Sequence, residues 1–178
     1  MEIFKIESED SSDHWRFLKP EGRVVLDLGC GRWCTREGSW ENLVHEEFSP
    51  IYLSKMGAKK IIGVDTSKNE IDYFNETTKN ESNKFLFLEL EINSPEQLKK
   101  LIFDHNIDMI KSDIEGYETN FLSFTKEDLL NIKYFAVEYH SHSIKNSFIE
   151  KFREWGFDIT ANGELWVDGL GVLFAEKK

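Results

Sequence analysis

A short polar stretch carries the densest set of side chains that could do chemistry. It covers residues 111–118 and reads Lys-Ser-Asp-Ile-Glu-Gly-Tyr-Glu, and His140 follows at the end of a later apolar run. A carboxylate or an imidazole can take the proton from an attacking hydroxyl group, and an unperturbed imidazole titrates near neutral pH. Asp113 and His140 are therefore candidate general bases. Two plainer interpretations stay open: His140 and His142 can form a hydrogen-bonded pair at a strand end, and Glu118 can pair with a helix neighbour.

A glycine turn follows an apolar run near the start of the chain. Val24–Leu28 is typical of a buried parallel strand, and Gly29 and Gly31 come directly after it. Glycines there let the backbone turn sharply and leave room for a ligand. The Gly-x-Gly-x-x-Gly fingerprint of dinucleotide-binding folds needs a third glycine where the chain has Cys34. A tight turn without a ligand is the plainer alternative.

A second apolar run also ends in an acid. Ile61–Asp65 reads Ile-Ile-Gly-Val-Asp, and the carboxylate of Asp65 would stand where an acid can accept hydrogen bonds from both hydroxyls of a ribose. The alternative is a strand-end carboxylate that caps the next helix together with Thr66 and Ser67. Because a glycine turn precedes this strand in the chain, the ribose interpretation is favoured.

Strand and helix patterns alternate along the chain and position these groups. Five strands are predicted in succession, each followed by a helical pattern, and two adjacent strands follow with a turn at Ala161–Glu164 between them. Such alternation predicts an α/β fold with a parallel sheet covered by helices on both faces, and its ligand crevice lies outside the carboxyl ends of the strands. The strands are expected at Val24–Leu28, Ile61–Asp65, Lys84–Leu90, Asp108–Asp113, Lys133–His140, Phe157–Thr160 and Trp166–Ala175, and the helices at residues 49–57, 71–80, 94–103, 121–130 and 146–155.

These motifs resemble those of a known enzyme family. The sequence Asp-Leu-Gly-Cys-Gly at residues 27–31 is similar to the first motif of class I S-adenosylmethionine-dependent methyltransferases. Residues 111–118 resemble the Lys-x-Asp-x-Glu-Gly-x-Glu signature of FkbM-type methyltransferases, and Val137–His140 resembles their Glu-x-His element. The likeness covers roughly residues 24–156. The first motif has the generic form here, whereas the FkbM family more often has Asp-x-Gly-Ala-Asn-x-Gly.

The resemblance implies a Rossmann-like class I methyltransferase fold, in which a mostly parallel seven-stranded sheet ends in an antiparallel hairpin. It also implies S-adenosyl-L-methionine as the cofactor and O-methylation of a hydroxyl on a small molecule, such as a sugar or secondary metabolite. N-methylation of a small molecule or protein side chain, and a catalytically silent cofactor-binding subunit, stay open as alternatives. The implied catalytic residues are Asp113, Glu138 and His140. For the cofactor, the resemblance implies Asp27 near the methionine amino group, Asp113 at the sulfonium, and the turn residues Gly29, Cys30 and Gly31. It further implies Asp65 and Thr66 at the ribose and Glu91 and Ile92 at the adenine.

Composition narrows the class of partner. The 178 residues suit one domain, expected as an N-terminal segment (1–22) followed by a Rossmann-like core (24–178). A net charge of −11 without a basic run disfavours nucleic acid. No apolar stretch is long enough to span a bilayer and no signal-peptide core is present, so a cytoplasmic protein without a membrane partner is expected. Cys30 and Cys34 lack the spacing of a zinc site, and no metal site is predicted, although the methyltransferase resemblance leaves a divalent ion at Asp113 open as an alternative.

The stretch after the fourth predicted strand also argues against nucleic-acid bases as substrates. Methylation of a base amino group would call for Asn/Asp-Pro-Pro-Tyr/Phe, where the chain has Ser-Asp-Ile-Glu at residues 112–115. Methylation of a pyrimidine carbon needs a cysteine nucleophile, and both cysteines lie at the first strand.

Two irregular segments are expected to contact the site or the sheet. The connection Arg32–Glu47 leaves the glycine turn and holds Trp33 and Trp40 without helical periodicity, so it is either a cover over the site or a surface excursion. Ser11–Leu18 predicts a short helix whose aromatic side chains pack on the sheet edge or over the crevice.

Overall fold

A computed structural model describes residues 4–6, 15–31, 49–164 and 168–177. It contains one sheet of eight strands in the order β1-β7-β8-β6-β5-β2-β3-β4. The strands are β1 (Phe4–Ile6), β2 (Val24–Leu28), β3 (Lys60–Asp65), β4 (Phe85–Glu89), β5 (Met109–Ser112), β6 (Tyr134–Tyr139), β7 (Phe157–Glu164) and β8 (Gly171–Lys177). The helices, 3-10 turns included, are η1 (Trp15–Phe17), α2 (Ser49–Lys55), α3 (Lys68–Thr77), η2 (Lys79–Glu81), α4 (Pro95–His105), η3 (Tyr117–Ser123), η4 (Glu127–Leu129) and α5 (His142–Trp155).

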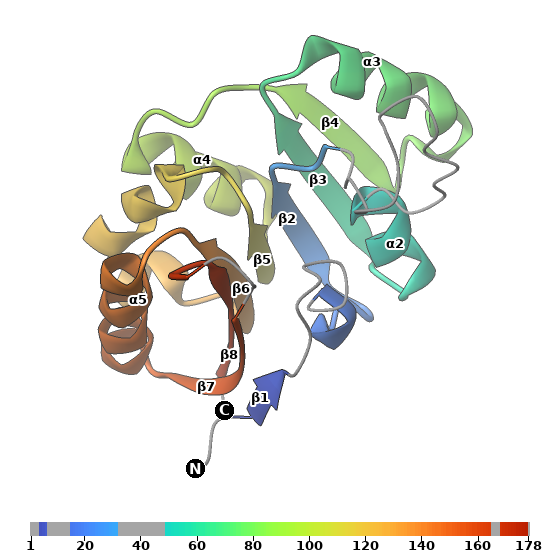
Figure 1. Ribbon diagram of the computed structural model, residues 1–178. Coiled ribbons are helices and arrows are strands. Elements are labelled where there is room, and N and C mark those ends of the chain that lie inside the picture. The colour runs from blue at the N-terminus through green and yellow to red at the C-terminus, as the bar shows by residue number, and fades with distance from the viewer. Residues whose placement is uncertain (1–3, 7–14, 32–48, 165–167, 178) are drawn as a thin grey trace.

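The sheet confirms the predicted α/β fold with a mostly parallel sheet and a terminal hairpin. Strands β2 to β6 are parallel to their sheet neighbours among themselves, whereas β8 runs antiparallel to both β6 and β7 (Figure 1). After the edge strand β1, the chain enters the middle of the sheet at β2, moves outward to β3 and β4, and returns to the other side of β2 with β5. The carboxyl ends of β2 and β5 therefore flank the point where the strand order reverses, which is where such sheets bind ligands.

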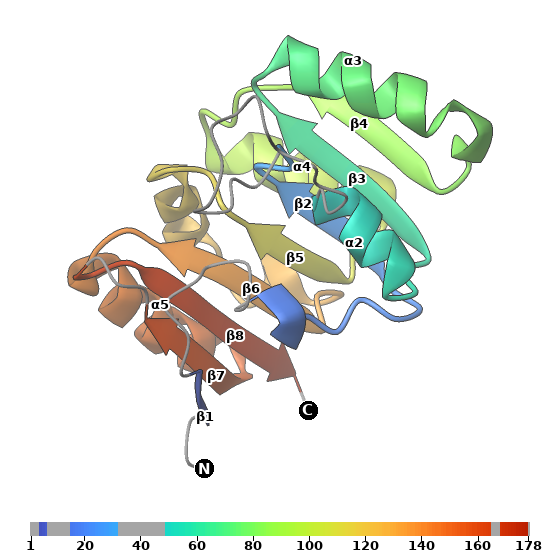
Figure 2. The same cartoon turned by 45° about the vertical axis from the view of Figure 1, so that its right-hand side comes forward.

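The predicted count of seven strands was too low by one. The eighth strand is β1, which pairs in parallel with β7 at the edge of the sheet (Figure 2). Three residues with Phe4 and Ile6 on opposite sides of a lysine give too short a pattern to identify a strand from sequence. Backbone pairing with β7 determines this strand.

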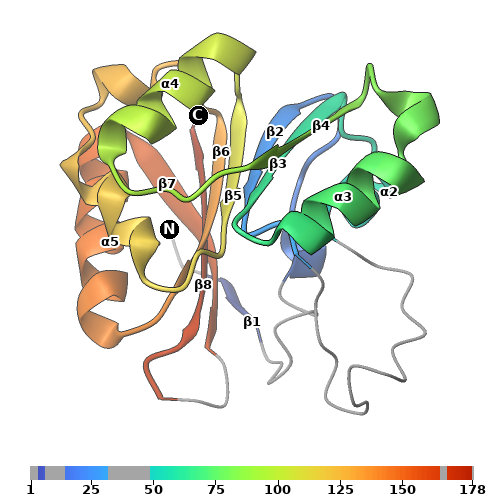
Figure 3. The same ribbon diagram turned by 90° about the horizontal axis from the view of Figure 1, so that it is seen from above.

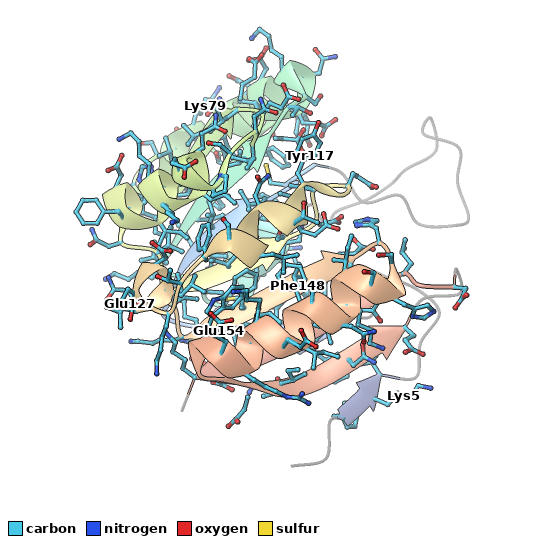
Figure 4. All side chains as sticks on the ribbon, turned by 90° about the vertical axis from the view of Figure 1, so that its left-hand side faces the viewer. Lys5, Lys79, Tyr117, Glu127, Phe148 and Glu154 are labelled. Carbon is cyan, nitrogen blue, oxygen red and sulfur yellow. The ribbon has the colours of Figure 1, made fainter. Side chains whose placement is uncertain are left out.

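Helices cover both faces of the sheet, as predicted. Helices α4 and α5 lie on one face and α2 and α3 on the other (Figure 3). Figure 4 looks onto the α4 and α5 side, where Phe148, Phe152 and Trp155 recur at helical spacing and are buried against the sheet. On the opposite face, Phe74 of α3 stacks on Phe87 of β4 with ring centroids 4.8 Å apart.

Local capping signals of two helices have the geometry expected from their sequences. The Oγ of Ser94 accepts a hydrogen bond from the backbone N–H of Gln97, and the Gln97 side chain accepts one from the N–H of Ser94. Helix α5 begins after Ser141, whose Oγ accepts from the N–H of Ile144, and ends at Gly156 in the left-handed region.

Two predicted elements were wrong in form. The Ala161–Glu164 turn is instead the end of β7, with a register irregularity between Ile159 and Ala161. Pairing with β1 on one side and β8 on the other outweighs the local turn preference of Asn-Gly. The predicted helix at residues 121–130 is instead the end of η3 followed by η4, and the two 3-10 turns are separated at Phe124, whose backbone is extended.

The irregular segments are described only in part. The connection Arg32–Glu47 and residues Ser11–His14 lie outside the described residues. Trp15 and Leu18 are buried against the sheet on the α2 and α3 face, and Phe17 contacts Phe174 of β8. The described part of this segment therefore packs on the sheet. In the described ranges, no helix has the length and apolar character needed to cross a membrane.

Candidate functional site

A cavity of about 740 Å³ opens at the carboxyl ends of β2, β3, β4 and β5. Its size is in the usual range for a site that takes a small molecule or cofactor. Side chains from β3, β4 and the chain after β5 face one another across it. The described lining is Gly29, Val64, Asp65, Thr66, Glu89, Leu90, Glu91, Ile92, Asp113, Ile114, Glu115 and Tyr117, the last of which is labelled in Figure 4.

The glycine turn after β2 forms one wall of this cavity. Gly29 has φ +69°, and a Cβ atom there would lie 1.8 Å from the backbone oxygen of Asp113. The N–H groups of Gly29 and Cys30 both donate to the carbonyl of Val64, at 2.9 and 3.2 Å. Glycine is therefore required at residue 29 by the close approach of β2 to the chain after β5. The packing of the protein's own backbone accounts for this glycine before any ligand is considered.

Asp65 supports the start of α3 and also lines the cavity. Its Oδ1 accepts the backbone N–H of Ser67 at 2.8 Å, and the Oγ of Ser67 in turn caps α3 by accepting from Glu70. A Cβ on Gly31 would lie 3.1 Å from the Oδ2 of Asp65, so the glycine leaves space beside that oxygen. One carboxylate oxygen is thus fixed by the helix start, and the carboxylate lines the cavity together with Thr66.

The chain after β4 supplies an apolar wall and further acids. Ile92 is buried and lines the cavity, and Glu89 and Glu91 stand at its exposed side. An aliphatic side chain beside carboxylates suits an aromatic ring that carries an exocyclic amino group. The cavity therefore has carboxylate hydrogen-bond acceptors at Asp65 and Glu91 and an apolar surface at Ile92.

Asp27 does not reach the cavity. It is fully buried, and its Oδ1 lies 3.0 Å from the Nζ of Lys111, which is its direct register partner across β2 and β5. The Oγ of Ser49, the first residue of α2, donates to the Oδ2 of Asp27 at 2.6 Å. Burial raises the pKa of Asp27 while Lys111 opposes that shift. Its immediate contacts are thus internal to the protein.

Cys30 and Gly31 also lie outside the described lining of the cavity. Cys30 is fully buried with its sulfur toward β3, and a Cβ on Gly63 would come within 3.0 Å of that sulfur. Burial raises the pKa of the Cys30 thiol far above its ordinary value. This thiol is a packing group.

Beside the cavity, the chain after β5 meets the end of β6 in a cluster of acids around His140. The Nδ1 of His140 lies 2.8 Å from the Oε1 of the fully buried Glu118, and its Nε2 lies 3.4 Å from the Oε2 of Glu115. The backbone N–H of Gly116 donates to the other oxygen of Glu118 at 2.6 Å. The hydrogen bond to Glu118 raises the pKa of His140 above its ordinary value, although partial burial opposes the shift. Glu118 therefore holds the ring so that Nε2 points toward Glu115.

Glu138 and Asp113 form a second acid pair in this cluster. Glu138 is buried near the end of β6, and Asp113 follows β5 and lines the cavity. Burial raises the pKa of Glu138 to about 10, and Asp113 adds to the shift by its charge and by accepting a hydrogen bond from the protonated Glu138. At neutral pH, Glu138 is therefore a neutral donor to the Asp113 carboxylate.

Three of these residues could together hold a metal ion. One ligand atom from each of Asp113, Glu115 and His140 lies within 4.8 Å of the other two. Carboxylates with one imidazole can bind a divalent cation, and the contact of Glu118 with the opposite ring nitrogen is the kind that orients a histidine ligand. The same three side chains could also exchange protons with a ligand without a metal.

The predicted site residues thus divide between the cavity and its surroundings. Six of them line it, namely Gly29, Asp65, Thr66, Glu91, Ile92 and Asp113. Glu138 and His140 contact residues of the lining, whereas Asp27 and Cys30 are buried away from it. Sequence reasoning missed the pairing of Asp27 with Lys111 and Ser49 and the role of Glu118 as the partner of His140. The register of β2 on β5 gives the first pairing, but only the folded chain supplies that register.

Comparisons with known proteins support the fold. No family model and no curated protein matches the sequence. The ribosomal protein L11 methylase of Lactobacillus delbrueckii subsp. bulgaricus aligns with TM-score 0.54 and 13% identity over 89% of this chain and 71% of its own. The METTL16 MTase domain aligns with TM-score 0.58 and 12% identity over 90% of this chain and 61% of its own. At such identities the likeness shows the fold alone: this chain has the fold of class I methyltransferases.

A third solved structure has the same fold. Sp1610 of Streptococcus pneumoniae, titled as a candidate tRNA (m1A22) methyltransferase, aligns with TM-score 0.59 and 13% identity over 97% of this chain and 72% of its own. The names of the three proteins point to different substrates, a ribosomal protein and tRNA among them. The shared feature is therefore the sheet and its crevice.

Proposed function

We propose that this chain is an S-adenosyl-L-methionine-dependent methyltransferase that methylates a hydroxyl group of a small molecule. One observation carries the proposal: the cavity at the strand-order reversal has Asp65 and Ile92 at one end and the Asp113 and His140 cluster at the other. The fold shared with class I methyltransferases supports the cofactor class. The sequence likeness of residues 111–118 and 137–140 to FkbM-type enzymes supports the hydroxyl acceptor.

The residues of the cavity fit this cofactor. Asp65 and Thr66 would bind the ribose hydroxyls, Ile92 would pack on the adenine face, and Glu91 would accept from its amino group. When bound, S-adenosyl-L-methionine supplies an electrophilic methyl group on a positively charged sulfur. The carboxylate of Asp113 would favour that positive charge, and the hydrogen bond from Glu138 orients it.

His140 is the proposed general base. Glu118 accepts the hydrogen bond from Nδ1, so the lone pair of the neutral ring is on Nε2. That nitrogen would take the proton as the acceptor oxygen attacks, and the acceptor would lie beside Glu115 and Tyr117. No metal is assigned a role in this step.

N-methylation is the second candidate because the described cavity lining contains five carboxylates and no lysine or arginine. Such a lining favours an acceptor that carries an amine. The L11 methylase among the solved structures is titled as acting on a protein. A silent cofactor-binding subunit is the third candidate. Nucleic acid is disfavoured by the net charge of −11.

One assay separates the three candidates. The purified protein is incubated with S-adenosyl-L-methionine carrying a labelled methyl group and two acceptor panels, matched in size, of hydroxylated metabolites and of amines. Label on a hydroxyl compound supports the proposal, and label confined to amines favours the second candidate. Calorimetric binding of S-adenosylhomocysteine with no transfer to either panel favours the silent subunit. Absence of binding overturns the proposal.

A further inference from the structure

The carbonyl of the glycine turn accepts a hydrogen bond from a buried lysine. The Nζ of Lys111 lies 3.1 Å from the backbone oxygen of Gly29, and Lys111 is fully buried. Burial of a lysine ammonium is costly unless it is paired and hydrogen-bonded. Lys111 has both kinds of partner, because Asp27 lies 3.0 Å away. The indole ring of Trp15, with its centroid 5.0 Å from Nζ, covers it from the N-terminal segment.

The other contacts of the turn are to neighbouring strands. Val64 of β3 accepts the N–H groups of Gly29 and Cys30, and the N–H of Asp113 after β5 donates to Leu28. The bonds to Val64 fix the N–H groups of the turn to β3, and the bond to Leu28 joins the end of β2 to the chain after β5. The carbonyl of Gly29 points the other way, and Lys111 is the charged donor that meets it. Because Gly29 lines the cavity, its carbonyl orientation sets the shape of the wall there.

We propose that Lys111 is a positioning residue that fixes the Gly29 turn for cofactor binding, and that Asp27 serves as its buried counterion. The inference rests on the proposed function for the identity of the cofactor. It differs from the role that the family resemblance implied for Asp27, which placed this carboxylate at the methionine amino group. In the structure, both oxygens of Asp27 have partners inside the protein, Lys111 and Ser49.

A variant that removes both buried charges together can separate the positioning role of Lys111 from its effect on the stability of the fold. Replacing Lys111 alone leaves a buried carboxylate without its cation, which destabilises the fold. The double variant Asp27→Asn, Lys111→Met removes both charges, and methionine keeps an unbranched side chain of similar length beside Trp15. Asp27→Asn alone retains the Lys111 bond to the Gly29 carbonyl. The matched control is the double variant Asp128→Asn, Lys99→Met, since Lys99 also pairs with an aspartate at 3.0 Å and lies 5.2 Å from a phenylalanine ring centroid.

The experiment measures S-adenosylhomocysteine affinity by calorimetry, the melting temperature, and amide exchange at Gly29 and Cys30 by NMR without ligand. We expect the Asp27 and Lys111 double variant to melt as a folded protein and to bind about tenfold more weakly, the loss typical of one charge-assisted hydrogen bond. Exchange at both amides should accelerate. The control should bind within about threefold of wild type, a difference well below one such bond. Asp27→Asn keeps the Lys111 bond to the Gly29 carbonyl but leaves the buried ammonium without its counterion, so its loss of affinity should be smaller than that of the double variant.

Two results would overturn the inference. Wild-type affinity together with unchanged amide exchange in the double variant would leave Lys111 only an ion-pair partner. A loss in Asp27→Asn as large as in the double variant would make Asp27 the group that matters for the cofactor. If wild type binds no S-adenosylhomocysteine, the proposed function fails, and the exchange measurement still decides whether Lys111 fixes the turn.

Discussion

The Nδ1 atom of His140 lies 2.8 Å from the Oε1 atom of Glu118, a carboxylate with no exposed surface that also accepts the N–H of Gly116. This contact fixes the tautomer of the imidazole and the direction of its second nitrogen. It also couples the end of β6 to the loop after β5, so the candidate base depends on two segments.

His140→Ala should lower the rate of methyl transfer by about a hundredfold, the scale of one general base, and leave S-adenosylhomocysteine affinity nearly unchanged. The matched control is His142→Ala, since His142 is exposed and pairs with the exposed Asp168. Turnover and calorimetry on both variants check this. Equal rates in wild type and His140→Ala would transfer the role of base to Asp113 or to proximity alone.

The pH dependence of the methyl-transfer rate should reflect the contact between His140 and Glu118. A base works in its neutral form, so the rate should rise with pH through a pKa above that of an ordinary histidine, because Glu118 stabilises the protonated ring. In Glu118→Gln the amide oxygen can still accept from Gly116, and the amide N–H would face Nδ1. The rise should then move to lower pH and the plateau should fall, because the proton is forced onto Nε2. A profile that stays in place would rule out His140 as the titrating base.

Asp65→Asn should weaken S-adenosylhomocysteine binding about tenfold, as expected when a hydrogen bond to a charged group is replaced by a neutral one. The exposed Asp104→Asn on α4 is the control, since Asp104 pairs only locally with Lys100 in the described contacts. Calorimetry measures both. We prefer this variant to a change at Gly29, where a side chain would collide with the backbone of Asp113 and disturb the fold itself. Full affinity in Asp65→Asn would remove the ribose assignment.

Glu138 should make the protein less stable as the pH rises. Its pKa in the folded state is raised from 4.5 to about 10, so the folded state holds a proton that the unfolded chain releases. The stabilisation is complete below about 4.5 and is lost as the pH rises toward about 10. Urea unfolding of wild type and Glu138→Gln across this range should show wild type losing stability relative to the variant, because glutamine stays a neutral donor. Parallel stability curves would contradict the protonated pair.

Chelation should leave the transfer rate unchanged, because the proposed step uses the imidazole of His140 and no metal. The assay compares the protein with EDTA against the same protein with added Mg²⁺. If EDTA abolishes transfer and Mg²⁺ restores it, a cation at Asp113, Glu115 and His140, the cluster whose ligand atoms lie within 4.8 Å, becomes part of the mechanism.

Sequence patterns could predict the strands because each is a separate apolar run. Val24–Leu28 and Ile61–Asp65 agree with β2 and β3 to within one residue. The capping box at Ser94 is likewise local, since its partners lie three residues apart. The errors fall where distant pairing decides, as in β7, whose Asn-Gly sequence is held extended by two neighbouring strands.

The candidate site shows the same division. Asp65 ends β3 and Ile92 comes shortly after β4, and both line the cavity because the ends of these strands, which are evident in the sequence, open onto it. Asp27 also lies close to the end of a strand that is evident in the sequence. Its side chain nevertheless lies beside Lys111, whose position depends on the register of β2 on β5. The contact of His140 with Glu118 likewise joins segments that are 22 residues apart. Sequence spacing does not reveal such contacts.

The edge strand β1 has a consequence for how the chain is made. Phe4 pairs with Ala161, so β1 finds its partner only when β7 has been synthesised. Until then its backbone groups stay bound to water, and closing so long a loop is slow and entropically costly. We therefore expect β1 to dock last, onto a sheet that β2 to β8 have already assembled.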